Sequence, residues 1–441
     1  MTPNPAADPA ARFVGPGAWR QGGAYGLLGL PLAFVALPLY VLLPNHYARE
    51  FAAPLGALGA VLLGTRLIDA LLDPAIGRWC DRLAARSARA VLSVGALAAV
   101  VLALGLWGLL FPPASVRSPG NTLLAWAGAA LVLTYIAYSV LSVAHQAWGA
   151  RLGGDETQRS RVVAWREGFA LVGVLVASVL PALAGLQGVV VVFAAALALA
   201  WWAWSVSVAP LPTRDHATET IREVSPWRHS AFRRLMAVFV LNGTASALPA
   251  TLVLFFVQDR LQAPAHAEPV VLATYFACGA LSIPLWVRAV ARWGLARSWL
   301  LGMALAVATF AWAATLGSGD WAWFVVVCAL SGLALGADLA LPSAMLAGVI
   351  GQLGERGRSE GAFFGWWNLA AKLNLALAAG VALPLLALLG YAPGARDPQA
   401  LQALTAAYCL LPCLLKCAAA LALYLGVIRP AAGHAPSPLH T

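Results

Sequence analysis

Twelve long apolar stretches follow one another along this chain, and they restrict it to one kind of fold. Each stretch reaches the roughly 20 residues that a helix needs to cross the hydrocarbon core of a bilayer. Because lipid offers the backbone no hydrogen-bond partners, a stretch of this kind crosses as a helix. The stretches are 22–44, 53–76, 89–112, 122–148, 163–186, 188–210, 235–257, 269–291, 298–317, 321–347, 361–390 and 402–427. We therefore expect an all-α membrane protein with twelve transmembrane helices.

The positions of the basic side chains orient these helices. The chain has 28 basic residues and a formal net charge of +10. Twenty arginines fall in tails and loops at one end of the predicted helices, and four fall at the other end: Arg49, Arg117, Arg260 and Arg396. Basic loops stay in the cytosol, so we expect the arginine-rich end and both termini to be cytosolic. With no nucleic-acid-binding motif in the chain, we expect no nucleic-acid partner.

A polar loop at the middle of the chain separates two sets of six predicted helices. We predict a cytosolic tail at 1–21, a six-helix bundle at 22–210, a cytosolic linker at 211–233, a second six-helix bundle at 234–428 and a cytosolic tail at 429–441. A six-plus-six chain is typical of transporters that bind their substrate between two halves. We expect a multi-pass monomer of the inner (plasma) membrane, whose partners are the lipid bilayer and a small-molecule substrate.

Three charged residues share one face of the second predicted helix. Arg66, Asp69 and Asp73 are spaced i, i+3, i+7, which places them on one side of a helix. A charge at the centre of a span costs about 2.5–3.5 kcal/mol on insertion scales, so such residues usually face a polar cavity and partner one another. One interpretation is a site for a coupling cation, with Asp69 and Asp73 as metal ligands if the ion is Na⁺. The other is a structural ion pair between helices.

Polar side chains of the first, fourth and fifth predicted helices are candidates to complete this site. Ser139, Ser142 and Gln146 follow one helical face and could reach the carboxylates or bind a polar ligand, although hydrogen bonding between helices explains them equally. His145 beside them could take a proton. Arg166 could be an interfacial anchor, an ion pair or a ligand clamp. We assign Ser139 and Ser142 to the cation, and Tyr25, Arg66, Ser142, His145, Gln146 and Arg166 to the substrate.

The second half of the chain adds its own polar candidates. Asp338 is the only acid deep in this half, and Lys372 is the partner we expect if Asp338 forms a salt bridge. Trp367 could stack on a sugar ring or an apolar chain, or belong to an interfacial belt. The substrate-binding candidates here are Asn242, Asp338, Trp367, Asn368 and Lys372. We assign Lys416 no role.

Several classes of protein are excluded by motifs that the chain lacks. We find no Walker loop, no GxGxxG phosphate loop, no Ser/His/Asp arrangement and no Cys/His metal spacing. We therefore expect neither an enzyme nor an ATP-driven pump, and no cofactor. A gradient of Na⁺ or H⁺ is the remaining common source of energy.

Two motifs resemble a known transporter family. The first is Arg66-x-x-Asp69-Ala-x-x-Asp73-Pro74-x-x-Gly77-x-x-x-Asp81-Arg82. It resembles the span-two signature of the glycoside–pentoside–hexuronide:cation symporters, the melibiose-permease branch of the major facilitator superfamily. The second runs from Arg358-Ser-Glu360-Gly361 to Lys372 and resembles that family's loop into span eleven.

This resemblance implies the major facilitator fold and alternating-access symport driven by Na⁺ or H⁺. It implies that Asp69 and Asp73 are the cation carboxylates, that Arg166 lies near the sugar site and that Lys372 is the family's span-eleven lysine.

The chain departs from this family at the sugar-binding positions. The carboxylates of melibiose permease in spans one and four correspond to Pro31 and Ser142, and its stacking tryptophan corresponds to Gln146. We expect the substrate to be a glycoside-like or other polar organic solute. The alternative is an amphipathic substrate, a lysolipid or a drug-like molecule, on the same fold. A third hypothesis, a membrane sensor or assembly factor that transports nothing, is disfavoured because Asp69 and Asp73 are retained.

Overall fold

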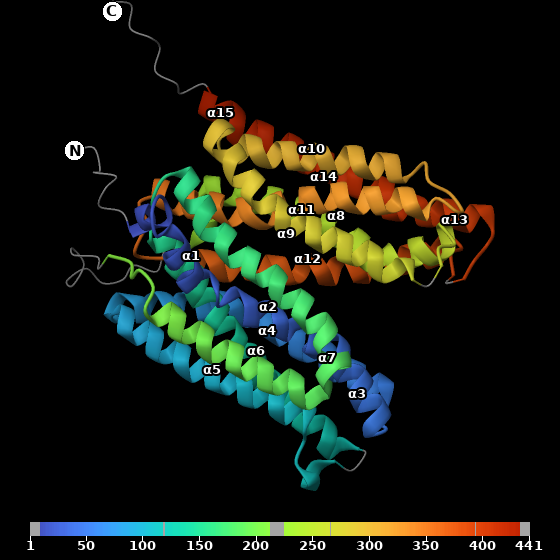
Figure 1. The fold of residues 1–441 in the computed structure, drawn as a ribbon, viewed down its shortest axis with the longest axis horizontal. Coiled ribbons are helices and arrows are strands. Elements are labelled where there is room, and N and C mark those ends of the chain that lie inside the picture. Colours follow the sequence, from blue (N-terminus) through green and yellow to red (C-terminus); the bar gives the residue numbers. More distant parts are fainter. Residues whose placement is uncertain (1–8, 118–119, 212–224, 265, 393, 433–441) are drawn as a thin grey trace, which may run out of the picture. The chain divides into compact units, whose positions relative to one another are not determined.

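The structure of this chain is helical wherever it is described. The computed structural model describes residues 9–117, 120–211, 225–264, 266–392 and 394–432, and all regular elements in these ranges are helices (Figure 1). Residues 1–8 of the predicted N-terminal tail, residues 212–224 of the predicted linker and residues 433–441 of the predicted C-terminal tail lie outside the described residues. The fold class expected from the apolar stretches is confirmed.

The chain divides into two compact units. The first comprises Met1–Ser225 together with Ile350–Leu369, and the second comprises Pro226–Val349 together with Ala370–Thr441. The division after residue 225 falls inside the predicted linker 211–233, but the segment 350–369 was expected in the second bundle. The limits of the two bundles therefore stay predictions, and each unit is described by itself.

The first unit begins with a helical run that is broken twice. The run contains α1 (Ala18–Gly26), α2 (Gly29–Leu37), the π-helix η3 (Pro38–Leu42) and α3 (Leu43–Glu50), and a short helix, η2 (Pro9–Phe13), precedes it. Pro38 begins the π-helix, since a proline lacks the N–H that an α-helix would use at this position. The run covers the first predicted stretch, 22–44.

Longer helices complete the first unit. They are α4 (Leu55–Arg86), α5 (Ala88–Leu110), the short η4 (Ala114–Val116), α6 (Asn121–Arg151) and α7 (Glu156–Ser205). The 50 residues of α7 are two helices joined at Gly185, whose φ of 62° and ψ of −174° suit glycine. The break lies near the end of the predicted stretch 163–186, two residues before residue 187, which separates that stretch from 188–210. In this unit α7 packs on α1 and α2, and α6 packs on α4 and α5.

The second unit contains most of the remaining helices. They are η5 (Pro226–Arg228), α8 (Ser230–Phe255), η6 (Phe256–Arg260), α9 (Ala267–Trp293), α10 (Leu295–Ala313), α11 (Trp321–Gln352), α12 (Glu360–Leu388), α13 (Pro398–Thr405), η7 (Ala406–Leu410), α14 (Leu411–Leu423), η8 (Tyr424–Ile428) and α15 (Arg429–Ala432). Of these, α11 ends and α12 begins in the segment that belongs to the first unit. Within the second unit α14 packs on α8 and α10.

Aromatic side chains form the centre of the second unit. Phe256 stacks on Tyr408 with ring centroids 4.3 Å apart, and Phe324 lies 5.3 Å from Phe256. Phe310 makes an edge-to-face contact with Tyr408, with ring centroids 5.8 Å apart. Aromatic pairs of this kind add to the stabilisation from their buried area, so they hold α10, α11, η6 and η7 together.

Many of these helices are suited to a bilayer. In the part of the chain that the structure describes, nine helices are long and apolar enough to cross a membrane. The predicted stretches 53–76 and 361–390 fall on α4 and α12, which are not among these nine. The chain is therefore a multi-pass membrane protein, and the number of twelve crossings stays a prediction.

Candidate functional site

Two carboxylates of α4 are removed from solvent in the first unit. Asp69 is 4% exposed and Asp73 is 0% exposed. Ser139 Oγ of α6 donates a hydrogen bond of 2.8 Å to Asp69 Oδ1. The packing of α4 on α6 thus brings together Asp69 and Ser139, a carboxylate and a hydroxyl that the sequence assigns to the coupling cation.

The polar stripe of α6 continues away from Asp69. Ser142 is also buried, and Gln146 Nε2 donates to Ser142 Oγ at 2.9 Å. This bond joins two predicted substrate residues on successive turns of one helix. Hard cations prefer carboxylate, hydroxyl and carbonyl oxygens, so Asp69, Asp73 and the two serines offer groups that suit either Na⁺ or a proton.

Arg66 lies one helical turn before Asp69 but has a different environment. Its side chain is exposed, and its guanidinium carbon lies 4.0 Å from the ring centroid of Tyr40 in η3. A cation over an aromatic face at this distance is attracted by the ring quadrupole. The π-helix at Pro38 therefore places an aromatic ring beside the first charge of the motif.

The first turns of α12 pack directly against α4 within the first unit. A Cβ atom at Gly365 would lie 3.0 Å from Pro74 Cα and closer still to the Asp73 carbonyl oxygen. A Cβ atom at Gly77 would likewise collide with the carbonyl of Gly361. Small residues let two membrane helices approach with their backbones in contact, and here they fix the backbone next to Asp73.

A charged cluster lies beyond this contact, and the sequence had assigned it no role. Arg151 of α6 donates to Asp81 Oδ1 at 2.8 Å and to Glu360 Oε2 at 3.0 Å. Asp81 also accepts from the backbone N–H groups of Gly361 and Ala362, each at 2.7 Å. A carboxylate at a helix N-terminus is stabilised by the unpaired N–H groups and the helix dipole. The cluster ties α4 and α6 to the start of α12.

His145 lies inside the packing of three helices. Its side chain is 0% exposed, and its ring stacks on Tyr25 with centroids 4.3 Å apart. Its Nε2 lies 2.8 Å from the Tyr25 carbonyl oxygen, while Tyr25 Oη donates to the His145 carbonyl at 3.1 Å. Trp204 meets the ring edge-on at 5.5 Å. These predicted substrate residues therefore pack α1 against α6 and α7.

Arg166 has the ion pair that the sequence allowed as one of three roles. It donates to Glu167 Oε1 from two nitrogens, at 2.6 and 2.9 Å, and it is buried. Its carbonyl oxygen is close enough to Gly29 to exclude a Cβ there, so α2 and α7 touch at this point.

In the second unit the carboxylate of Asp338 accepts hydrogen bonds from four side chains. Asp338 Oδ1 accepts from Asn242 Nδ2 at 3.0 Å and from Trp299 Nε1 at 2.9 Å. Asp338 Oδ2 accepts from Ser246 Oγ at 3.0 Å and from Lys416 Nζ at 2.8 Å. The predicted substrate residues Asn242 and Asp338 are thus direct partners.

The cation beside Asp338 differs from the one the sequence suggested. Lys416 of α14 forms the ion pair, and its Nζ also donates to Asn242 Oδ1 at 2.8 Å. The sequence suggests Lys372 as the partner of Asp338 in a salt bridge and assigns Lys416 no role, which is wrong for this pair. Which helix lies against α11 cannot be read from spacing along the chain, and the packing of α14 on α8 brings Lys416 into reach. The pair lines a cavity of about 120 Å³ with Ser331 and Tyr275.

The remaining predicted residues lie on α12. Trp367 is buried and Asn368 partly buried in the first unit, and Lys372 is partly buried in the second. Two residues later, Asn374 accepts a hydrogen bond of 3.3 Å from Thr244 of α8. No role of these α12 side chains is tested, so their assignment to the substrate stays a prediction. In the described residues no three His, Cys, Asp or Glu side chains cluster as a metal site would require.

The chain is similar to known membrane transporters. The Escherichia coli (strain K12) inner membrane symporter YicJ is 24% identical over 235 residues, which are 49% of this chain and 49% of YicJ. The match therefore spans about half the length of that curated relative.

Solved structures share the fold. A bacterial homologue of the iron transporter ferroportin, in the outward-facing state, has a TM-score of 0.68 at 16% identity, over 93% of this chain and 99% of that chain. The E. coli fucose:proton symporter FucP has a TM-score of 0.65 at 14% identity, over 91% of this chain and 98% of FucP. At these identities the two matches show that this chain shares their fold, and the MFS family model that matches residues 24–428 confirms the major facilitator fold implied by the motifs.

A family model described as MFS/sugar transport protein matches residues 24–428, nearly all of the described helices. On the strength of that match, the chain belongs to the MFS/sugar transport protein family.

Proposed function

We propose that this protein is a cation-coupled secondary transporter of the inner membrane, which moves a glycoside-like or other polar organic solute by alternating access. The coupling ion is Na⁺ or H⁺. Membership of the family supports this proposal, as do the relative named as an inner membrane symporter and the fold neighbour named as a fucose:proton symporter. The protein acts as a monomer, with no enzymatic step and no cofactor.

The observation that carries the proposal is the pair of buried carboxylates on α4. A carboxylate removed from water needs hydrogen bonds, a proton or a cation to stabilise its charge. Ser139 supplies one hydrogen bond to Asp69, and an entering cation supplies positive charge to both acids. Binding of Na⁺ or a proton at Asp69 and Asp73 then changes the charge of the site by one unit. A gradient of Na⁺ or H⁺ across the membrane can therefore drive this change in charge.

The solute side of the proposal rests on Arg66 and its neighbours. The exposed guanidinium over Tyr40 lies on the same helix face as Asp69, so it presents planar N–H donors next to the cation site. Such donors bind hydroxyl or carboxylate oxygens. A solute held there would be sensitive to whether Asp69 and Asp73 are neutralised, which couples its binding to that of the ion.

The test begins with finding a substrate. Purified protein is screened by thermal shift against sugars, glycosides and organic acids, with Na⁺ or K⁺ and at several pH values, because a ligand stabilises the folded state by mass action. Stabilisation by Na⁺ in the absence of solute assigns Na⁺ as the ion. Dependence on pH alone assigns H⁺.

The screened substrate is then used in proteoliposomes. The double variant Asp69→Asn/Asp73→Asn should lose uptake against a gradient while solute exchange is partly retained. Asp397→Asn is the matched control, because this exposed aspartate caps α13 and asparagine also caps a helix. Uphill uptake that survives in the double variant would show that the carboxylates do not carry the ion.

A further inference from the structure

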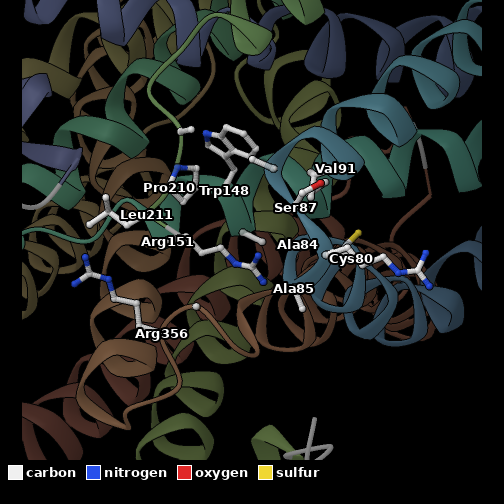
Figure 2. Close-up of a pocket in the computed structure, with 16 residues that line it drawn as sticks. Cys80, Ala84, Ala85, Ser87, Val91, Trp148, Arg151, Pro210, Leu211 and Arg356 are labelled. Carbon is white, nitrogen blue, oxygen red and sulfur yellow. The ribbon is translucent and has the colours of Figure 1, made fainter. Parts of the chain in front are cut away.

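A second site lies in the first unit, apart from the carboxylates of α4. Figure 2 shows a cavity where α4 ends, α5 begins and α6 ends, and its volume is about 640 Å³. Ligand sites in proteins typically have volumes of about 300–1,000 Å³. Neither Asp69 nor Asp73 lines this cavity, and the proposed transport cycle does not use it.

One part of the cavity wall is apolar. Trp148 and Leu211 lie on one side in Figure 2, and Val91 lies across from them on α5. Ala144 and Ala147 of α6 continue the same surface. Trp148 is fixed in place, because its Nε1 donates to the Val208 carbonyl at 3.0 Å. This apolar part of the wall suits the hydrocarbon portion of a ligand.

The charged part of the wall is basic. Arg86, Arg151 and Arg356 line the cavity, and no acidic side chain is among the described residues that do. The charge of Arg151 is balanced by Asp81 and Glu360 behind the wall. Arg86 and Arg356 are exposed residues of the lining, so their positive charges belong to the cavity wall.

The start of α5 adds to this positive potential. Ser87 and Ala88 line the cavity, and α5 begins at Ala88. Ser87 Oγ accepts from the backbone N–H of Ala90, which satisfies one of the free N–H groups of the first turn. The others, together with the helix dipole, favour an anion at this end.

We propose that this cavity binds the phosphate head group of an anionic phospholipid. Guanidinium groups bind phosphate oxygens through paired N–H donors, and basic pockets at the cytosolic ends of membrane helices suit such head groups. The apolar wall at Trp148 and Val91 takes the start of the acyl chains. The helix ends around the cavity are those that the arginine distribution predicts to be cytosolic, so the lipid comes from the cytosolic leaflet.

Binding at this position acts on the charged cluster. Arg151 belongs both to the cavity wall and to the ion pairs with Asp81 and Glu360. A lipid bound here holds the ends of α4, α5 and α6 together in the arrangement that forms those pairs. It therefore stabilises this arrangement by mass action, and the stabilisation rises with the lipid concentration.

Cys80 provides the readout, because it lies on the cavity wall and is buried (Figure 2). Protein in detergent receives phosphatidylglycerol, phosphatidylcholine or glycerol phosphate. Maleimide modification of Cys80 is followed over time by peptide mass spectrometry, with the exposed Cys417 as an internal reference. At about ten times its dissociation constant, phosphatidylglycerol should slow the reaction of Cys80 about tenfold, leave Cys417 unaffected and raise the melting temperature.

Matched variants show whether the arginines recognise the lipid. Arg86→Gln/Arg356→Gln should lose this protection, and the single variant Arg86→Gln, at an exposed position, should weaken it. Arg292→Gln/Arg297→Gln is the control, since it removes the same charge from exposed positions at the predicted cytosolic end of the second unit.

Three results would overturn the proposal. Equal protection by phosphatidylcholine would show that the arginines do not select the ligand. Equal protection by glycerol phosphate would assign the cavity to a soluble phosphate. Protection that survives in the Arg86 and Arg356 variants as in their control would place the lipid elsewhere.

Discussion

Among single residues, Lys416 is a buried cation whose charge depends on its neighbours. It is 3% exposed in a helix rich in Leu and Ala, and its partners are Asp338 and Asn242. A buried ion pair is not by itself evidence of high stability, but removing one member leaves the other charged and unpaired. The pair therefore makes the second unit sensitive to substitution at either position.

Lys416→Met should destabilise the protein by about 3–5 kcal/mol, the usual cost of breaking a buried pair from one side. Thermal unfolding of the purified protein in detergent measures the change. The double variant Lys416→Met/Asp338→Asn should recover much of the loss, because it removes both charges while Asn keeps an acceptor for Trp299. A single variant as stable as the parent, or a double variant less stable than the single, would contradict this account.

At this scale the sequence predicts which side chains matter better than it predicts their partners. Asp338 and Asn242 stand out because polar groups are rare in apolar spans, and the structure joins them. Arg151 and Glu360 are 209 residues apart, so nothing local shows that they form an ion pair. His145 has the chemistry of a proton acceptor, yet stacking on Tyr25 encloses it. The residue type shows which chemistry a side chain can perform, but its contact partners depend on how the helices pack.

At the level of elements, the contact between α4 and the start of α12 depends on glycine. Gly361 and Gly365 are one turn apart on α12, and their missing side chains let the backbone of α4 approach near Gly77 and Asp73. The same approach puts the N–H groups of α12 onto Asp81. The geometry next to Asp73 is therefore set by the backbone.

Gly365→Ala should cost about 1–3 kcal/mol, because the added methyl group collides with backbone atoms that cannot move aside easily. Gly168→Ala is the matched control: this glycine lies within α7 and has no atom within 4 Å of a new Cβ. The control should be neutral or stabilising by up to about 1 kcal/mol, since alanine is the better helix former. Melting temperatures of both variants test the difference in sign, and destabilisation of equal size in both would count against a specific contact.

The predicted apolar stretches lie largely on helices, because length and hydropathy find most elements that can cross a bilayer. The stretches 53–76 and 361–390 fall on α4 and α12, which are not among the nine helices of the described residues that meet both criteria. The irregularities inside the helices are less visible. Gly185 splits α7 two residues before the boundary at residue 187 that the sequence predicts, so this break was predictable to within a few residues. The π-turns at Phe256–Arg260 and Ala406–Leu410 could not be predicted from the sequence, since they add a residue to a helix without changing its composition.

For the whole molecule, the sequence predicts the order of the helices better than their grouping into units, and the orientation in the membrane stays a prediction. Residues 350–369 belong to the first unit although they follow the linker by more than a hundred residues. The reason is physical: Glu360, Gly361 and Gly365 make their hydrogen bonds and backbone contacts with α4 and α6. Orientation depends instead on where arginines are placed along the chain, which needs no knowledge of packing.

The two ends of α11 provide the test of that orientation. Ser318 precedes this helix at the end predicted to be outside, Gln352 ends it at the predicted cytosolic end, and both are exposed. In intact cells with a permeable outer envelope, a membrane-impermeant maleimide should label Ser318→Cys and leave Gln352→Cys unlabelled, because only the first thiol is outside. After the membrane is opened with detergent, both should react, which shows that each thiol is accessible. The unsubstituted chain gives the background from its own cysteines, chiefly the exposed Cys417. The opposite pattern in intact cells would invert the topology, and it would move the arginine-lined cavity to the outer side of the membrane.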